Sequence, residues 1–263
     1  MAFMAEGYLD PEFAPMAHRG GALLTANLGI ENTLAAFQNA VDLGYTYMET
    51  DVHATSDGVA LAFHDPNLAR VTDIDARISD LPFAALKEVR VAGKEPIPRV
   101  EELLEAFPRQ RFNFDIKSPG AIEPLARVIE RSKAQQRVCV ASFSQARISR
   151  FRRRLPGVTT AFGPVGVSRM VGGLLPRRRD RGPAVFQVPV EQRIAGVRIR
   201  VLTPERVAAI HRAGFKVHVW TIDTPGQMHT LIDWGVDGIV TDRPDLLKNV
   251  LQARGMWERS TGT

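Results

Sequence analysis

Acidic residues and histidines follow one another in a tight order between residues 18 and 65 of this 263-residue chain. Glu49 and Asp51 lie two positions apart, so on a strand both side chains point to the same face. Two carboxylates on one face make half of a site for a hard cation. His18 precedes this pair and His64 follows it, and two histidines can supply an acid and a base. In this order, the four residues predict a metal-assisted hydrolase.

A third acid occurs in the stretch from Arg111 to Lys117, which we expect to be a strand. Apolar and polar residues alternate along it, which gives one face suited to packing against helices and one polar face, formed by Asn113, Asp115 and Lys117. A buried ion pair between Asp115 and Lys117 is the structural interpretation. Desolvation makes such pairs a poor source of stability, so the pattern favours a functional role.

The elements that must position these residues alternate between strands and helices. Setting aside a hairpin strand at 59–64, we expect eight β/α steps, with strands near residues 16, 47, 113, 140, 160, 187, 218 and 239. Eight steps in about 250 residues are the count and size of an α/β fold of the (β/α)8 TIM barrel type. An open doubly wound sheet is the alternative, and the lack of a glycine-rich dinucleotide motif after the first strand counts against it.

A TIM barrel carries its functional groups at the carboxyl ends of its strands. The predicted strands do end on candidate residues: His18 and Arg19, Glu49 and Asp51, Asp115 and Lys117, and Trp220 near the end of the seventh. The less regular stretch at about 66–110 we expect to be a small insertion after the second strand. We therefore expect residues 1–263 to form a single barrel domain.

Composition indicates the cellular compartment of the protein rather than its function. The single cysteine, Cys139, excludes an internal disulfide, suggests a reducing compartment and lies in a run typical of a buried strand. The start of the chain has no basic, apolar leader, and no stretch approaches the roughly 18 apolar residues of a membrane span. We therefore expect a cytoplasmic protein.

The net charge of +5 comes largely from arginines at 147–154 and 177–181. Such clusters can attract nucleic acid or an anionic membrane surface. Apart from Phe151, no aromatic residue interleaves with them as a base-stacking surface would need. We interpret them as a solvated helix face and a loop, expect no nucleic-acid partner, and regard membrane contact as permitted but not required. The oligomeric state stays open.

Together these motifs resemble those of the glycerophosphodiester phosphodiesterases, within the phospholipase C-like phosphodiesterase superfamily of TIM barrels. The resemblance covers about residues 15–247 and rests on His18-Arg19-Gly20, Glu31-Asn32-Thr33, Glu49-Thr50-Asp51, Asp57-Gly58, His64-Asp65, Asn113–Lys117, His218–Ile222 and Asp237–Pro244. It implies a (β/α)8 barrel that hydrolyses a small-molecule glycerophosphodiester to glycerol 3-phosphate and an alcohol, with one divalent cation, Mg²⁺ or Ca²⁺.

The resemblance also implies roles for individual residues: catalytic His18 and His64, metal-binding Glu49, Asp51 and Asp115, and substrate-binding Arg19, Lys117 and Trp220. Asp115 stands where the family usually has a glutamate, and this shorter acid affects metal preference more than activity. By the same analogy, the substrate's own glycerol 2-hydroxyl attacks to give a cyclic phosphate that water opens. We expect His18 as the acid and His64 as the base in the first step.

Two alternatives stay open. A lysophospholipase D-type phosphodiesterase of the same superfamily fits the acidic set, although the early part of the chain lacks the exposed apolar lip of secreted enzymes of this kind. A non-catalytic phosphate- or membrane-binding module is less favoured, because both histidines and all three acids are present. We expect His53 at the surface and His211, His218 and His229 without catalytic duty, and we expect the insertion to shape headgroup selection.

Overall fold

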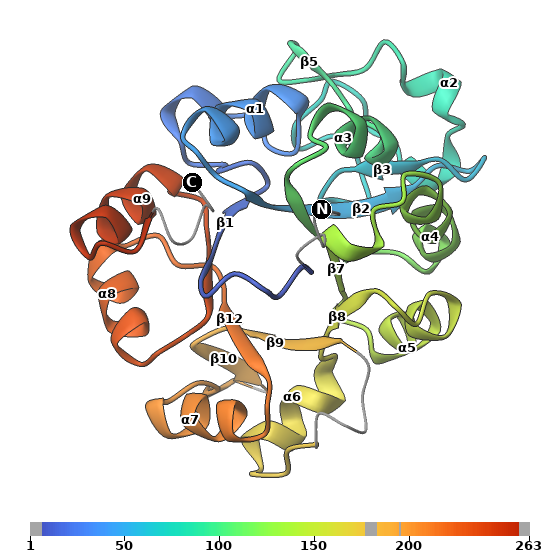
Figure 1. Ribbon diagram of the computed structural model, residues 1–263. Helices are drawn as coiled ribbons and strands as arrows, with labels where there is room; N and C mark the ends of the chain where they lie inside the picture. Colours follow the sequence, from blue (N-terminus) through green and yellow to red (C-terminus); the bar gives the residue numbers. More distant parts are fainter. Residues whose placement is uncertain (1–6, 177–182, 195, 258–263) are drawn as a thin grey trace, which may run out of the picture.

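The strands of the computed structural model, which describes residues 7–176, 183–194 and 196–257, close into a barrel inside a ring of helices (Figure 1). Its parallel strands are β1 (Ala14–His18), β2 (Tyr47–Ala54), β6 (Arg111–Ile116), β7 (Val138–Ala141), β8 (Thr159–Ala161), β9 (Ala184–Val188), β12 (Lys216–Val219) and β13 (Gly238–Thr241). β1 pairs with both β13 and β2, which closes the sheet. The predicted (β/α)8 barrel is therefore confirmed, and the open sheet is excluded.

Helices follow the strands and cover the outside of the barrel: α1 (Leu34–Asp42), α3 (Val100–Ala106), α4 (Ile122–Arg131), α5 (Gln145–Arg154), α6 (Pro164–Val171), α7 (Pro204–Arg212), α8 (Pro225–Asp233) and α9 (Pro244–Ala253). Proline opens four of them, because the first helical position needs no N–H partner. Side-chain oxygens of Thr33, Ser144 and Thr203 accept backbone N–H groups at the starts of α1, α5 and α7. These local signals set where the barrel's loops begin and end.

The stretch after the second strand departs from the alternation, as expected. β3 (Ala60–Ala62) runs antiparallel to β2, and the short elements η2 (Ile78–Asp80), α2 (Phe83–Leu86), β4 (Arg90–Val91) and β5 (Glu95–Pro96) follow it. Residues from Leu61 to Ile97 share an apolar cluster of their own. α3, by contrast, packs its apolar residues in the main core, so it belongs to the ring of helices.

An antiparallel hairpin after β9 was not anticipated from the sequence. It consists of β10 (Glu191–Ile194) and β11 (Val197–Arg200), and Gly196 in its turn has a φ of 81°. A left-handed backbone of this kind favours glycine. The remaining short elements are single 3₁₀ turns: η1 (Thr25–Asn27), η3 (Pro119–Ala121) and η4 (Gln135–Arg137).

The start of the described chain lies across one end of the barrel (Figure 1). The ring of Tyr8 is 1% exposed and packs edge-on against Tyr47, 5.2 Å between centroids. The hydroxyl of Tyr47 donates a hydrogen bond to the Tyr8 carbonyl at 2.5 Å, and Lys216 Nζ donates to the Pro11 carbonyl at 2.6 Å. Tyr47 and Lys216 open their strands, so this segment closes the amino-terminal end of the barrel.

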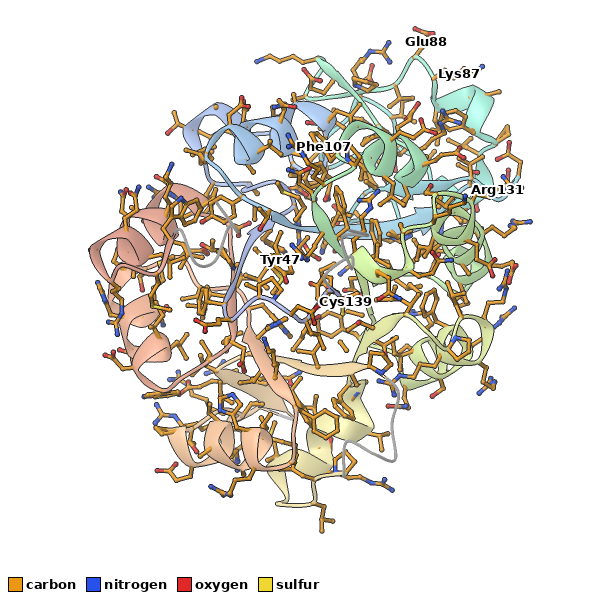
Figure 2. All side chains as sticks on the ribbon, viewed as in Figure 1. Tyr47, Lys87, Glu88, Phe107, Arg131 and Cys139 are labelled. Carbon is orange, nitrogen blue, oxygen red and sulfur yellow. The ribbon has the colours of Figure 1, made fainter. Side chains whose placement is uncertain are left out.

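Figure 2 separates the interior from the periphery: Tyr47 and Cys139 lie inside the ring of strands, whereas Lys87, Glu88 and Arg131 project from the outside. Cys139 is buried, as expected.

The arginines of α5 make contacts within the chain. Arg154 pairs with Glu123 and Glu130, and Arg152 donates to Thr160 Oγ1 at 2.6 Å. The arginines at 177–181 lie outside the described residues. Within the described ranges, none of the helices combines the length and the apolar character needed to cross a membrane.

Candidate active site

A cavity of about 700 Å³ lies at the carboxyl ends of the barrel strands, and its lining divides into two parts. The polar wall comes from the first half of the barrel and comprises His18, Arg19, Glu49, Asp51, His64, Asp115 and Lys117. The apolar wall begins after the fourth barrel strand and continues through the second half of the barrel. It comprises Phe143, Phe162, Val167, Val171, Ile199, Val201 and Trp220. The structure therefore brings all eight residues predicted as site residues together around one cavity.

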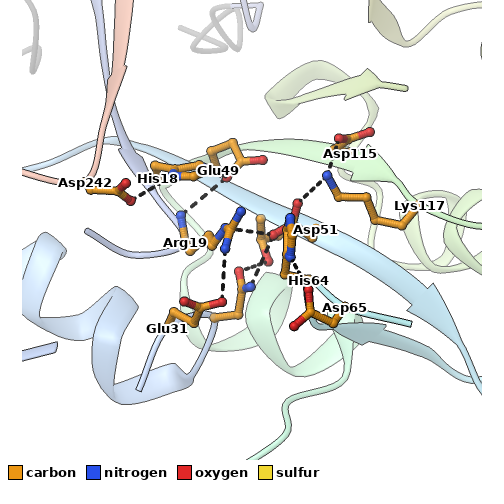
Figure 3. Close-up of polar contacts among 12 residues, drawn as sticks. His18, Arg19, Glu31, Glu49, Asp51, His64, Asp65, Asp115, Lys117 and Asp242 are labelled. Carbon is orange, nitrogen blue, oxygen red and sulfur yellow. Dashed lines mark hydrogen bonds and ion pairs between the residues drawn. The ribbon is translucent and has the colours of Figure 1, made fainter. Parts of the chain in front are cut away.

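His18 ends β1 and is held between two carboxylates (Figure 3). Its Nδ1 lies 2.7 Å from Asp242 Oδ1, and its Nε2 lies 3.7 Å from Glu49 Oε2. Burial by itself lowers the pKa of His18, but the charge of Glu49 and the hydrogen bond with Asp242 outweigh it, so the pKa is raised. The ring is thereby oriented and favoured in its protonated form.

Asp242 is a site residue that the sequence reasoning missed. It follows β13 directly, and its backbone N–H donates to Asp223 Oδ1 at 2.8 Å. The signal in the sequence was an acid just after the carboxyl end of a barrel strand, a position that does not by itself indicate a partner. Asp223 thus supports the loop that carries the partner of His18.

His64 has its own carboxylate partner, Asp65 (Figure 3). A chain of ion pairs leads from this partner to Arg19. His64 Nδ1 lies 2.6 Å from Asp65 Oδ1, and Asp65 also contacts Arg70. Arg70 then pairs with Glu31 at 2.6 Å, and Glu31 with Arg19 at 3.1 Å. Burial raises the pKa of Asp65, but Arg70 and His64 lower it further than burial raises it. The insertion therefore contributes Arg70 to the support of the polar wall.

The three acids come from adjacent parallel strands. In the β2–β6 register, Asp51 is level with Asp115, while Glu49 is level with Asn113. Lys117 Nζ lies 2.8 Å from Asp51 Oδ1 and 2.7 Å from Asp115 Oδ2. The ion pair considered from the sequence is thus present, and it extends to a second carboxylate.

Electrostatics differ among these acids. Burial and the neighbouring charge of Asp51 raise the pKa of Glu49 to about 7, and burial raises the pKa of Asp115. Burial also acts to raise the pKa of Asp51, but Lys117 and Arg19 outweigh it, so the pKa is lowered. The protein's own cations therefore stabilise the charge of Asp51 better than that of its neighbours.

The chemistry of this cluster fits a hard divalent cation. Asp115 Oδ1 is buried and has no hydrogen-bond partner among the described residues. The set offers carboxylate oxygens only, the donors that Mg²⁺ and Ca²⁺ prefer. In the described ranges, no three His, Cys, Asp or Glu side chains already form a metal-binding group, and the ammonium of Lys117 lies between two of the acids.

Asn32 is a second residue whose role the sequence reasoning missed. Its side-chain amide donates to Asp51 Oδ2 at 3.3 Å and accepts from Thr50 Oγ1 at 2.7 Å. Of the two residues considered as the cap of α1, Thr33 is the cap, because its hydroxyl accepts the N–H of Ala36. Asn32 instead orients a carboxylate of the polar wall.

The expectation that His53 lies at the surface was wrong. It lies opposite Leu61 in the β2–β3 pair, the residue is 5% exposed, and Nε2 donates to the His64 carbonyl at 3.0 Å. Burial lowers the pKa of His53 despite this hydrogen bond. His53 therefore contacts the backbone of a predicted catalytic residue although it does not itself line the cavity.

The apolar wall meets the polar wall at Phe143. This residue is 58% exposed, and its ring lies edge-on to Trp220 at 5.3 Å between centroids. Lys117 Nζ lies 5.3 Å from the same ring, a cation–π contact. Trp220 thus lines the cavity as predicted, on the side away from the carboxylates.

Comparison with known proteins gives concordant matches. A profile of the glycerophosphoryl diester phosphodiesterase family matches residues 18–246. A "Probable glycerophosphodiester phosphodiesterase 2" of Mycobacterium tuberculosis is 41% identical over 92% of this chain and 92% of its own length. A "Lysophospholipase D GDPD1" of Mus musculus is 26% identical over 90% of this chain and 85% of its own length.

Solved structures share the fold. An Oleispira antarctica phosphodiesterase, crystallised with the product sn-glycerol-3-phosphate, superposes with a TM-score of 0.74 at 23% identity. The match covers 91% of this chain and 96% of that one.

Proposed function

Because the chain belongs to the glycerophosphoryl diester phosphodiesterase family and is an enzyme of that class, we propose that its polar wall hydrolyses glycerophosphodiesters by a metal-assisted, two-histidine route. The family expected from the motifs is thereby confirmed. The observation that carries the finer proposal is the pairing of each histidine with its own carboxylate, His18 with Asp242 and His64 with Asp65.

We propose that Glu49, Asp51 and Asp115 hold one divalent cation, Mg²⁺ or Ca²⁺. The buried Oδ1 of Asp115, which has no partner among the described residues, supports this assignment, and so does the pKa of Glu49, which burial and the charge of Asp51 raise. A bound cation would give the first oxygen a partner and favour the ionised form of the second group. Such a cation, when bound, polarises a phosphate oxygen and offsets the charge that develops during the reaction. Arg19 and Lys117 add positive charge on the same wall and bind the phosphate.

The histidines exchange the protons. With Nδ1 of each ring held by a carboxylate, Nε2 is the atom available to the substrate. We assign His18 as the acid in the first step, because its environment favours the protonated ring. His18 then protonates the departing alkoxide, and His64 accepts the proton of the attacking hydroxyl.

The attacking group in this proposal is the substrate's own glycerol 2-hydroxyl. Its oxygen bonds to phosphorus, the bond to the departing alcohol breaks, and a cyclic phosphate forms. Water then opens the ring to glycerol 3-phosphate, with the two histidines exchanging roles. A substrate analogue without the 2-hydroxyl tests the route, since turnover equal to that of the parent compound would exclude it.

The primary test is release of glycerol 3-phosphate from glycerophosphocholine and glycerophosphoethanolamine, with Mg²⁺, Ca²⁺ or EDTA. We expect release only with a divalent cation, and a 10²- to 10⁴-fold lower kcat in His18→Ala, the usual contribution of a general acid. His229→Ala, a change at an exposed histidine, serves as the matched control and should leave kcat unchanged. Folded protein that releases no product with either metal would contradict the proposal.

The lysophospholipase D-type alternative uses the same polar wall and differs in what is attached to the glycerol. It has a named relative in the Mus musculus protein. The apolar wall of the cavity bears directly on the choice between these two classes of substrate.

A further inference from the structure

The cavity offers more surface than a phosphate and a glycerol use. Its volume of about 700 Å³ falls in the range of pockets that enclose drug-sized ligands, roughly 300–1,000 Å³. Among the described residues, every charged side chain in its lining belongs to the polar wall. The opposite side carries a few neutral polar residues, such as Ser168 and Gln192, but is mostly apolar, so it binds a ligand chiefly by removing apolar surface from water.

Two separate segments build the outer part of the apolar wall. Val167 and Val171 lie four residues apart on α6, so they share one face of that helix, and both are half-buried. Ile199 of β11 lines the same cavity. Trp220 and Phe143 connect this part to Lys117, so an apolar surface begins where the phosphate site ends.

We propose that this surface, between α6 and β11, binds the single hydrocarbon chain of a monoacylated glycerophosphodiester such as a lysophospholipid. The inference rests on the proposed function, because the phosphate of the same substrate must lie against the polar wall. The continuity of the two walls supports it, because Phe143 contacts both Lys117 of the polar wall and Trp220 of the apolar wall. Among the described residues, no charged side chain of the lining belongs to the apolar surface between α6 and β11, which we call the groove.

Two positions of the chain satisfy this chemistry. A chain on glycerol carbon 1 leaves the 2-hydroxyl free, and hydrolysis of the phosphate–alcohol bond by water gives an acylglycerol phosphate and the alcohol. A chain on the alcohol side gives glycerol 3-phosphate and a chain-bearing alcohol. The groove accommodates the hydrocarbon in either case, and substrates of both kinds distinguish the sources.

The test compares glycerophosphocholine with hexanoyl-, octanoyl- and decanoyl-lysophosphatidylcholine, all below their micellar concentrations, and with glycerophospho-N-octanoylethanolamine. Each methylene that enters an apolar site strengthens binding about fourfold. We expect kcat/KM to rise at least about tenfold from the hexanoyl to the decanoyl substrate, or with the N-octanoyl compound if the chain lies on the alcohol side.

Val167→Asp places a carboxylate in the groove and should abolish the gain with chain length, measured as the ratio of kcat/KM for the decanoyl and hexanoyl substrates of the same preparation. Val165→Asp is the matched control, because Val165 lies on the same helix, is 48% exposed and does not line the cavity. Ile199→Thr, a milder change on β11, gives a second variant if Val167→Asp fails to fold.

Binding of glycerol 3-phosphate and its hexanoyl to decanoyl esters, measured by calorimetry in the presence of Mg²⁺, separates this inference from the catalytic proposal. Affinity that rises with chain length and falls in Val167→Asp supports the groove even without turnover. Chain-independent turnover and binding, with normal hydrolysis of glycerophosphocholine, would overturn the inference and leave the proposed function intact. A preference for choline over ethanolamine without any chain effect would also overturn it, and would assign the aromatic rings to the headgroup.

Discussion

The polar and apolar walls face one cavity but are built in opposite ways. The polar wall uses residues at or near strand ends, and each is fixed by a charged or hydrogen-bonding partner, as in the Asp242–His18 and Asp65–His64 pairs. The apolar wall uses a helix, a hairpin and loops, such as Val167 on α6 and Ile199 on β11. In the proposed function, the groups that do chemistry are thus held by the barrel itself, whereas the groups proposed to select the substrate lie on segments outside its strands, where sequence change disturbs the barrel least.

The largest effect should come from the polar wall and should separate the two histidines. Glycerophospho-p-nitrophenol has a leaving group that needs no proton, so it bypasses the general acid. We expect His18→Ala to lower kcat 10²- to 10⁴-fold on glycerophosphocholine but much less on the nitrophenyl substrate, and His64→Ala to lower both. Stopped-time assays of both substrates check this.

The reverse pattern, with His64→Ala rescued by the nitrophenyl substrate, would exchange the two roles. Equal losses for both variants on both substrates would show that the two histidines do not act separately as general acid and general base. Far-ultraviolet circular dichroism of each variant serves as the control for folding.

A smaller effect should come from a buried histidine outside the polar wall, His218, and should appear in the pH dependence of stability. His218 of β12 is 1% exposed, its Nδ1 lies 3.4 Å from the amide nitrogen of Gln187, and burial lowers its pKa to about 3. Between that pH and the ordinary value of about 6.5, the unfolded state binds more protons than the folded state. Stability is therefore fully present above about pH 6.5 and declines as the pH falls, by up to about 1.4 kcal/mol per pH unit from this group.

Urea unfolding between pH 4.5 and 6.5 measures this slope. His218→Gln should flatten it, because the buried ring no longer resists protonation, whereas His229→Gln should keep the slope of the parent protein. An unchanged slope in His218→Gln would mean that His218 does not contribute to the pH dependence of stability, which would contradict the prediction.

The smallest effect should arise where the walls meet. Phe143→Leu keeps the apolar volume but removes the ring that contacts Trp220 and Lys117. Such ring contacts contribute about 0.5–1.5 kcal/mol, so we expect KM to rise about two- to tenfold and kcat to stay within about twofold. Steady-state kinetics on glycerophosphocholine measure both constants.

Phe83→Leu is the matched control, because Arg99 lies over the Phe83 ring, 5.7 Å from its centroid, at a site that does not line the cavity. If kcat rather than KM fell in Phe143→Leu, the ring would support the position of Lys117 during the chemical step, and the boundary between the walls would shift.

The polar wall was predictable from the sequence because its residues obey strand geometry. Alternation placed Glu49 and Asp51 on one face and put Asp115 beside them, and the eight strands occur at the expected positions. Asp242 escaped notice because it contacts His18 across 224 positions of the chain, and a single acid after a strand carries no pattern. The residue pattern of a short segment indicates its local geometry but does not indicate which distant residue it contacts.

The apolar wall was beyond such reasoning for a related physical reason. Val167 and Ile199 belong to separate segments, and nothing in the periodicity of either one indicates that both border the same cavity. The expected lack of an apolar lip concerned the early part of the chain, whereas this wall comes from later segments. His53 was misplaced because its burial depends on another segment: its side chain contacts the backbone of His64, eleven positions along the chain.

The segment around Tyr8 closes the amino-terminal end of the barrel, and this closure affects how substrate enters and product leaves. With Tyr8 and Phe13 at most 3% exposed, reactant and product must use the same opening, beside the apolar wall. Product must therefore leave through this opening before the next substrate can enter. A product that keeps its hydrocarbon chain departs more slowly than free glycerol 3-phosphate, so the substrates that bind most tightly should turn over at the lowest maximal rate.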